Sequence, residues 1–307
     1  MVDVIVIGAG PAGLTAAIYL RRAEKSVLII EKECFGGQIT HSPRVENYPG
    51  YESLSGAELG DKLFEHATSA GADVELDTVT GIEAIEGGYR VVCEGAVFDC
   101  RAVIIATGSR HRTLGLLHEE ELVGEGVSYC AVCDGAFYKD QRVAVVGGGN
   151  SALQDAVLLS DTCSHVTVVQ NLAFLTGEEK LLAILAERGN VDIILSTVVD
   201  ELIVEDGGFK GLSLKGTETG EMTFLPVDGV FVAIGRIPEN EPFRSAVELD
   251  ERGYVRAGED CRPNTAFPGV FVAGDCRTKA IRQVTTATAD GAVAALAACR
   301  FLNDQAK

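Results

Sequence analysis

The hydrophobic pattern of the chain repeats over two long stretches. Each stretch has an apolar run typical of a buried β-strand, then glycines, then an amphipathic helical segment and a second apolar run. The apolar runs that open the two stretches are Val4 to Ile7 and Val143 to Val146. The stretches align without a gap, with Gly8 over Gly147. The pattern predicts the same unit of strand, turn, helix and strand twice.

Both stretches carry glycines at the spacing of a dinucleotide-binding turn, G-x-G-x-x-G or A. The turn residues are Gly8, Gly10 and Gly13 in the first copy and Gly147, Gly149 and Ala152 in the second. Such a turn lets a pyrophosphate approach the backbone at a helix N-terminus. The first copy ends its second strand in Glu31, a carboxylate able to hold a ribose 2′-hydroxyl, whereas the second copy has Gln170 in the aligned place. We therefore expect a complete dinucleotide site in the first copy and an incomplete one in the second.

The rest of the pattern predicts an α/β fold of two Rossmann-like, doubly wound, three-layer nucleotide-binding domains. Further elements are expected as a helix capped by Ser55, strands at Ala102–Ala106, Val191–Leu195, Val198–Glu205, Val230–Ala233 and within Gly269–Cys276, and helices near Glu178–Arg188 and Val284–Phe301. The last strand and helix return to the pattern of the first domain. A second domain inserted into the first is the simplest layout, because the two ends of the chain then share one core. We expect residues 1–113 and 245–307 to form one domain and residues 114–244 the inserted one.

Composition and charge narrow the classes of partner. The 307 residues are 47% hydrophobic, enough to bury two ordinary cores. The net charge of −19 disfavours nucleic acid and anionic membrane surfaces as partners, since both need a positive field. No apolar run approaches the roughly 18 residues of a spanning helix, and no basic segment precedes the first strand. We expect a cytoplasmic protein.

The nine cysteines are scattered and odd in number, unlike a secreted disulfide framework. Only Cys130 and Cys133 form a C-x-x-C, within CAVCDG. A structural zinc site needs four ligands, and no second Cys/His pair lies at a fitting spacing. Two cysteines three apart at a helix start can close a small disulfide, and the helix dipole favours a thiolate on one of them. A redox pair is the preferred interpretation over zinc or plain surface thiols, with Asp134 beside it as proton donor or acceptor.

Eight motifs follow one another across nearly the whole chain. They are GAGPAG, GGQI, ENYPG, ATGS, CAVCDG, GGGNSA, AIGRIPEN and VFVAGDC. In this set and order the chain resembles the low-molecular-weight thioredoxin reductases, which are flavin disulfide oxidoreductases. The resemblance implies an FAD-binding domain, an inserted NAD(P)-binding-like domain that carries the C-x-x-C, a thioredoxin-like protein as electron acceptor, and a homodimer.

The resemblance also implies roles for particular residues. Those expected to contact FAD are Gly8, Gly10, Ala12, Gly13, Glu31, Gly37, Gln38, Asn47, Thr107, Gly108, Asp275, Arg282, Gln283 and Val284. Cys133 would face the flavin, Cys130 would attack the substrate disulfide, and Asp134 would serve as acid and base. A candidate second nucleotide site comprises Gly147, Gly149, Asn150, Ser151 and Ala152.

The chain departs from the family where NADPH-using relatives carry H-R-R-x-x-x-R to grip the 2′-phosphate. This chain reads VVQNLAFLTGEEK there, with no Arg or Lys between Val166 and Glu179. A 2′-phosphate needs such cations close by, and NADH would want a carboxylate at Gln170. The second turn is then either a relic kept for strand and helix packing or a nicotinamide site with unusual contacts.

If NAD(P)H is not the donor, electrons must come from another carrier, such as ferredoxin or a second flavin. An acidic ferredoxin is disfavoured by the net charge unless a local basic patch offsets it. Candidates for this patch are Arg110, Arg112, Arg277, Lys279 and Arg282, although such a cluster is more often a solvated face. Two further hypotheses stay open: an NAD(P)H-dependent thioredoxin reductase with an atypical grip, and a flavin-bound redox sensor that does not turn over.

Overall fold

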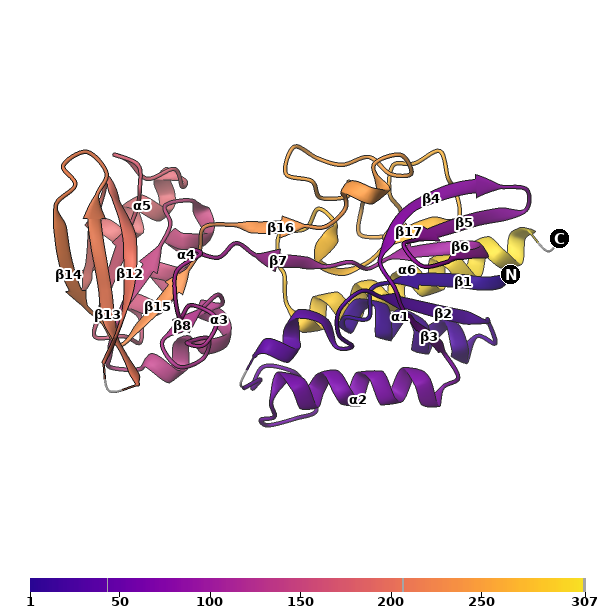
Figure 1. Ribbon diagram of the computed structural model, residues 1–307, viewed down its shortest axis with the longest axis horizontal. Helices are drawn as coiled ribbons and strands as arrows, with labels where there is room; N and C mark the ends of the chain where they lie inside the picture. Colours follow the sequence, from indigo (N-terminus) through magenta and orange to yellow (C-terminus); the bar gives the residue numbers. More distant parts are fainter. Residues whose placement is uncertain (43, 206, 306–307) are drawn as a thin grey trace. The chain divides into compact units, whose positions relative to one another are not determined.

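The structure is a computed structural model that describes residues 1–42, 44–205 and 207–305. The chain forms two compact units, the first made of Met1–Arg110 and Ile237–Lys307 and the second of His111–Arg236 (Figure 1). The changeovers lie at 110/111 and 236/237, whereas the sequence analysis expected 113/114 and 244/245. The chain re-enters the first unit before the predicted boundary at 244/245. Phe243, which is 1% exposed, already packs in the core of the first unit.

The first unit is built on a seven-stranded sheet. Its strands are β1 (Val2–Ile7), β2 (Val27–Glu31), β3 (Asp73–Leu76), β4 (Val79–Ile85), β5 (Gly88–Cys93), β6 (Val97–Ile105) and β17 (Val270–Val272). Its helices are α1 (Pro11–Arg22), α2 (Gly56–Ser69) and α6 (Val284–Gln305), with short 3₁₀ turns η1 (Gly37–His41), η3 (Glu241–Phe243) and η4 (Gly274–Cys276). The sheet order is β3-β2-β1-β6-β5-β4, and β17 also pairs with β6. The expected Ser55 cap is confirmed, with a capping box to Glu58.

Two apolar clusters cover the two faces of this sheet. On one face β1, β2 and β6 pack against α1 and α6 through residues such as Val4, Leu14 and Ala294. On the other face alternate residues such as Ile5 and Val103 meet the β4–β5 hairpin and Phe243. The parallel register of β1 with β2 and β6 brings the carboxyl ends of these strands to one edge, which is where open α/β sheets hold ligands.

The second unit repeats this plan around a five-stranded parallel sheet of order β11-β10-β9-β15-β8. The elements are β8 (Val127–Ser128), α3 (Ala131–Asp134), η2 (Gly135–Tyr138), β9 (Arg142–Val146), α4 (Asn150–Ser160), β10 (His165–Val169), α5 (Glu179–Ala186), β11 (Val191–Ile194), β12 (Thr197–Glu205), β13 (Gly208–Gly216), β14 (Met222–Pro226) and β15 (Gly229–Val232). An antiparallel sheet β12-β13-β14 covers one face, and α4 and α5 cover the other. The predicted α/β fold with two Rossmann-like units is confirmed.

The two chain segments that run between the units pair with each other as β7 (Ser109–His111) and β16 (Arg236–Pro238). The first element, β1, and the last, α6, both belong to the first unit, which makes the second an insertion (Figure 1). Over the part of the chain that the structure describes, no helix has the length and apolarity needed to cross a bilayer.

Candidate functional site

The first glycine turn connects β1 to α1. Gly10 is the N-cap of α1 and offers no side-chain cap, so the first N–H groups of the helix stay available for an anion. Pro11 at the first helical position costs no hydrogen bond. A Cβ on Gly13 would overlap the carbonyl oxygen of Gly8, and Ala12 is buried beside it. The turn therefore requires glycine at position 13 and leaves the start of the helix uncovered.

Glu31 lies at the end of β2, directly beside this turn, and is 9% exposed. Its Oε2 accepts the Ala9 N–H at 2.7 Å, and its Oε1 accepts the N–H groups of Lys32 and Glu33, each at 2.9 Å. Three backbone donors therefore fix the carboxylate against the turn.

A cavity of about 330 Å³ opens at the turn and Glu31. It is lined by Ile7, Gly8, Ile30, Glu31, Lys32, Asp77, Thr78, Val79, Thr107, Glu239, Glu241, Pro242 and Phe243. Only three of these were predicted from the sequence. Three others, Ile7, Ile30 and Lys32, lie beside the turn at the ends of β1 and β2. The rest come from residues 77–79, which lead into β4, and from the return segment 239–243, and no local motif marks them. A size near 300 Å³ with mixed apolar and polar walls suits a small-molecule site.

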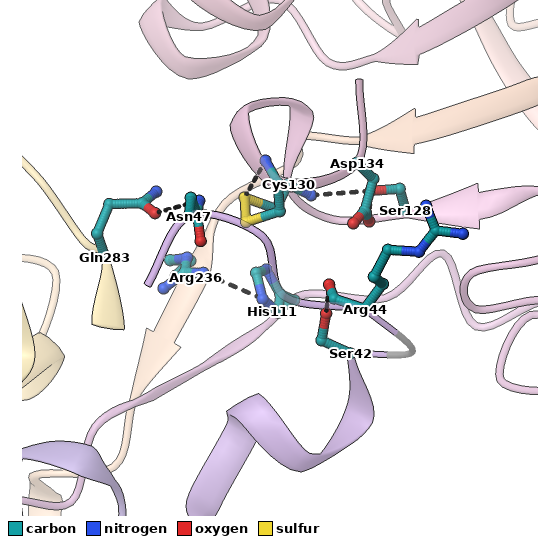
Figure 2. The surroundings of a disulfide bond; sticks show 10 residues. Ser42, Arg44, Asn47, His111, Ser128, Cys130, Asp134, Arg236 and Gln283 are labelled. Carbon is teal, nitrogen blue, oxygen red and sulfur yellow. Dashed lines mark hydrogen bonds between the residues drawn. A yellow bond between two sulfur atoms is a disulfide. The ribbon is translucent and has the colours of Figure 1, made fainter. Parts of the chain in front are cut away.

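The other residues predicted in the first unit lie on several elements. Gly37 and Gln38 begin η1, and Gly108 follows β6 with a φ of 68°. Asp275 lies in η4 and Val284 begins α6. The structure brings several of them into defined contacts. Asn47 Nδ2 donates to Gln283 Oε1 at 3.4 Å (Figure 2), Thr107 Oγ1 donates to Asn240 Oδ1 at 3.0 Å, and the Arg282 guanidinium lies 4.3 Å from the ring centre of Tyr254.

The suggested basic patch is wrong in its central members. Asp290, on α6, accepts from Arg277 Nε at 2.9 Å, from Arg277 Nη2 at 2.8 Å and from Lys279 Nζ at 3.0 Å. Arg277 is only 7% exposed. Asp290 also accepts the Gly274 N–H at 3.0 Å. Lys279 Nζ also lies 3.9 Å from Asp275 Oδ1. Because both cations are buried and paired with carboxylates, they present no positive surface to a partner.

Cys130 and Cys133 form a disulfide in the second unit, with their Cα atoms 5.2 Å apart. Cys130 is the N-cap of the one-turn helix α3, and its Sγ accepts the Cys133 N–H at 3.2 Å. Its carbonyl accepts the N–H groups of Cys133 and Asp134. The local geometry therefore places a backbone donor on the first sulfur of the pair.

Asp134 follows this pair directly and lies against Ser128 at the end of β8 (Figure 2). Ser128 Oγ donates to Asp134 Oδ2 at 2.6 Å and accepts the Cys130 N–H at 3.1 Å. Burial raises the pKa of Asp134, and the Ser128 bond partly opposes that shift. Asp134 Oδ1 is buried and has no hydrogen-bond partner among the described residues. Ser128 is 1% exposed and was not predicted, because nothing in GVSYC distinguishes it from a strand residue.

The second glycine turn connects β9 to α4. Gly149 is the N-cap without a side-chain bond, and Asn150, Ser151 and Ala152 begin the helix. Gln170 is 5% exposed and lies over Gly148, where a Cβ would overlap the Gln170 amide. The Gln170 amide donates to the Phe174 carbonyl at 3.3 Å and accepts the Asn171 N–H at 3.2 Å.

The loop after β10 lies against this second turn. The N–H groups of Thr176 and Gly177 donate to the Gly148 carbonyl at 2.8 and 3.0 Å. Glu178 N–H donates to Asn150 Oδ1 at 2.7 Å, and Asn150 Nδ2 donates to a Glu178 carboxylate oxygen at 2.9 Å. The first residue of α4 is therefore paired with a carboxylate, which is unfavourable for a pyrophosphate at that helix end.

The sequence matches proteins of known family over nearly its whole length. The model for the pyridine nucleotide-disulphide oxidoreductases matches residues 2–291. The chain belongs to this family. It is 43% identical over 304 residues to the thioredoxin reductase of Bacillus subtilis, covering 98% of this chain and 95% of that protein. The predicted resemblance to thioredoxin reductases and the oxidoreductase class are confirmed.

Two solved structures are similar over almost all of the chain. The thioredoxin reductase of Streptococcus pyogenes is 37% identical, with a TM-score of 0.91 and 99% of each chain covered. The thioredoxin reductase of Giardia duodenalis is 30% identical, with a TM-score of 0.92, covering 98% of this chain and 99% of that one. The family implies a flavin and a pyridine nucleotide as cofactors.

Proposed function

We propose that the chain reduces a thioredoxin-like protein through the Cys130–Cys133 disulfide, with FAD as the resident cofactor of the first unit and with a donor other than NAD(P)H. The observation that carries this proposal is the disulfide at the N-cap of α3, with a backbone N–H on Cys130 Sγ and a buried acid next along the chain. The named relatives are thioredoxin reductases, which supports the choice of acceptor.

The residues of the first turn fit FAD. The uncapped start of α1 at Gly10 suits a pyrophosphate, and the cavity beside Gly8 and Glu31 suits the adenosine end. We assign Thr107 and Gly108 to the adenine side, Asp275 to the ribityl chain, and Gly37, Gln38, Asn47 and Arg282 to Val284 to the flavin. When bound, FAD supplies the two electrons that open the disulfide.

The two cysteines divide the exchange chemistry. Opening the disulfide with two electrons leaves two thiolates, of which the backbone donor favours the one on Cys130. The Cys130 thiolate attacks one sulfur of the partner's disulfide, and the other partner sulfur leaves as a thiolate that takes up a proton. The Cys133 thiolate then attacks Cys130, which re-forms the internal disulfide and releases the second partner thiol.

Asp134 is assigned as the acid and base of this cycle. Its raised pKa means that it holds a proton at higher pH than an exposed carboxyl group does, so it can give one to a thiolate and take it back. Its position directly after Cys133 puts it on the same helical turn as the pair.

The second unit supports the exclusion of NAD(P)H as donor. Gln170 is an amide and offers no carboxylate to a ribose. Its side chain also lies over Gly148 and is bonded to the loop through the Phe174 carbonyl and the Asn171 N–H. Residues 171–178 contain no cation for a 2′-phosphate, and Glu178 pairs with Asn150 at the start of α4. We propose ferredoxin or a second flavin as the donor class. A ferredoxin would have to dock through the remaining candidates Arg110, Arg112 or Arg282, because Arg277 and Lys279 are paired with Asp290.

Two other candidates keep specific support. An NAD(P)H-dependent reductase with atypical contacts to the nucleotide is favoured by the intact glycine turn and by Gly149, an N-cap of α4 that makes no side-chain bond to the helix start. A flavin-bound redox sensor that does not turn over would also use the cysteine pair. We further expect a homodimer and a cytoplasmic location, both as predictions.

Reduction of the flavin under anaerobic conditions tests the donor. We expect NADPH and NADH at micromolar concentration to leave the flavin absorbance unchanged over minutes, and reduced ferredoxin to bleach it. Rapid bleaching by NADPH would refute the exclusion of NAD(P)H.

A pair of cysteine variants tests the disulfide. We expect Cys133→Ser to retain FAD and to lose reduction of thioredoxin, because no internal disulfide can form. Cys34→Ser changes an exposed free cysteine in the first unit and serves as the control with wild-type turnover. Unchanged turnover in Cys133→Ser would contradict the mechanism, and an inactive wild type would favour the sensor.

A further inference from the structure

Ser128 makes two hydrogen bonds that link the redox pair to the acid beside it. It ends β8, whose register with β15 pairs Ser128 with Phe231, and it is 1% exposed. Its hydroxyl oxygen accepts the Cys130 N–H at 3.1 Å, and its single proton goes to Asp134 Oδ2 at 2.6 Å (Figure 2). A buried side chain between a reactive cysteine and a carboxylate calls for a chemical role beyond strand packing.

The direction of these bonds follows from the inventory of donors. A serine hydroxyl has one proton and two lone pairs. The Cys130 N–H can only donate, so it takes a lone pair, and an ionised Asp134 can only accept, so it takes the proton. The hydroxyl is therefore oriented by its two neighbours, and its only proton is committed when Asp134 is charged.

The bond from Ser128 makes the two carboxylate oxygens of Asp134 different. Oδ2 is occupied by Ser128, whereas Oδ1 is buried with no partner within the described part of the chain. Protonation at Oδ1 leaves the Ser128 bond to Oδ2 in place, so we assign the proton that Asp134 takes up to Oδ1. Burial of the carboxylate disfavours its charge, and the Ser128 bond favours it.

We propose that Ser128 is a positioning residue for the disulfide chemistry. Its hydroxyl keeps Asp134 able to ionise, with Oδ1 as the atom that carries the proton, and it also fixes the backbone of Cys130. This role rests on the proposed function, because it concerns the proton that accompanies disulfide exchange. Without the hydroxyl, burial would act unopposed, so Asp134 would keep its proton to higher pH.

The test is a single turnover of the holoenzyme reduced with dithionite, mixed anaerobically with oxidised bacterial thioredoxin or with 5,5′-dithiobis(2-nitrobenzoate) over a range of pH. We expect Ser128→Ala to retain FAD, to react about tenfold more slowly at neutral pH, as expected for one lost hydrogen bond to a charged group, and to shift its pH profile to higher pH. Ser128→Thr, which keeps the hydroxyl, should restore the profile.

Two controls separate a proton role from a structural one. Ser160→Ala removes a buried serine of the same unit whose hydroxyl donates only to a helix carbonyl, and it should keep the wild-type profile. In an Asp134→Asn background, Ser128→Ala should lose only the bond to the Cys130 N–H, so the further loss should be smaller than in the wild-type background. A Ser128→Ala enzyme with the wild-type profile, or one with the same loss in both backgrounds, would overturn the role of Ser128 while leaving the proposed function intact. A wild type that fails to reduce either disulfide would overturn both.

Discussion

The two βαβ units, β1–α1–β2 and β9–α4–β10, use the same strand, glycine turn and helix but differ in what lies over the turn. In the first unit three backbone N–H groups hold the Glu31 carboxylate beside the turn, next to a cavity. In the second unit Gln170 lies on Gly148, and Glu178 pairs with the first residue of α4. The comparison shows that one glycine spacing supports the same packing of strand on helix beneath two different sets of side chains. We expect these side chains to decide whether a dinucleotide binds.

The largest expected effect comes from the third glycine of the first unit. We expect Gly13→Ala to destabilise the first unit by at least about 3 kcal/mol and to abolish FAD retention, because the new Cβ would overlap the Gly8 carbonyl. The matched change in the second unit, Ala152→Gly, should cost only about 1 kcal/mol of helix stability and leave FAD bound. Thermal unfolding and the flavin spectrum measure both. A yellow Gly13→Ala protein with wild-type stability would show that the turn is not close-packed.

The next effect tests the carboxylate that the second unit lacks. We expect Glu31→Gln, which copies Gln170, to weaken FAD binding about 30-fold, because an amide has one oxygen for three N–H donors. Fluorescence titration of the apoprotein with FAD gives the affinity. Glu33→Gln, at an exposed neighbour, is the control and should stay within about twofold of wild type. Equal affinities for Glu31→Gln and wild type would remove the distinction between the two units.

The third prediction adds to the second unit the cations that a 2′-phosphate needs. Asn171 and Leu172 are exposed at the positions where NADPH-using relatives place arginines. We expect the double change Asn171→Arg with Leu172→Arg to raise the rate of flavin bleaching by NADPH at least about tenfold, because two cations would meet the 2′-phosphate. The pair Asn171→Gln with Leu172→Gln controls for bulk. No gain in the arginine variant would mean that Gln170 and Glu178 alone exclude the nucleotide.

The smallest expected effect is on stability and concerns one aligned position within α1 and α4. Asp155 on α4 aligns with the buried Ala16 on α1, and burial raises the pKa of Asp155 to about 6 against the opposing charge of Arg236. Between roughly pH 4 and 6 the folded state holds a proton that the unfolded chain has lost, so stability falls as pH rises through this window. We expect Asp155→Ala to stabilise the protein by about 1 kcal/mol at pH 7, after allowance for solvent screening, and by little at pH 4. Melting temperatures that differ equally at both pH values would contradict this.

Local patterns predicted the elements well because the information lies within one segment. A few consecutive residues determine each of the Ser55 cap, the helix after Glu178 and the two glycine turns. The boundary near Phe243 was missed by several residues, since its burial depends on strands more than a hundred positions earlier. Element type was therefore more predictable than the point where the chain changes units.

The site divides in the same way. The disulfide and the Glu31 position were visible as motifs, and the structure places both as expected. The cavity wall at Val79 and Pro242 was not, because it joins distant loops. The basic patch failed because charge was counted without burial, and the partner Asp290 lies on the helix predicted near Val284–Phe301. Predictions of a charged surface from composition fail where a charged side chain is buried and paired with an opposite charge.

The contact between Gln170 and Gly148 constrains the order in which this turn can change. A methyl group at position 148, where the first unit has Ala9, would overlap the Gln170 amide, so that side chain would have to move. A carboxylate at position 170 would meet the Phe174 carbonyl instead of donating to it. Positions 148 and 170 are therefore coupled, because a change toward the first unit at either one requires the side chain at position 170 to leave its present place.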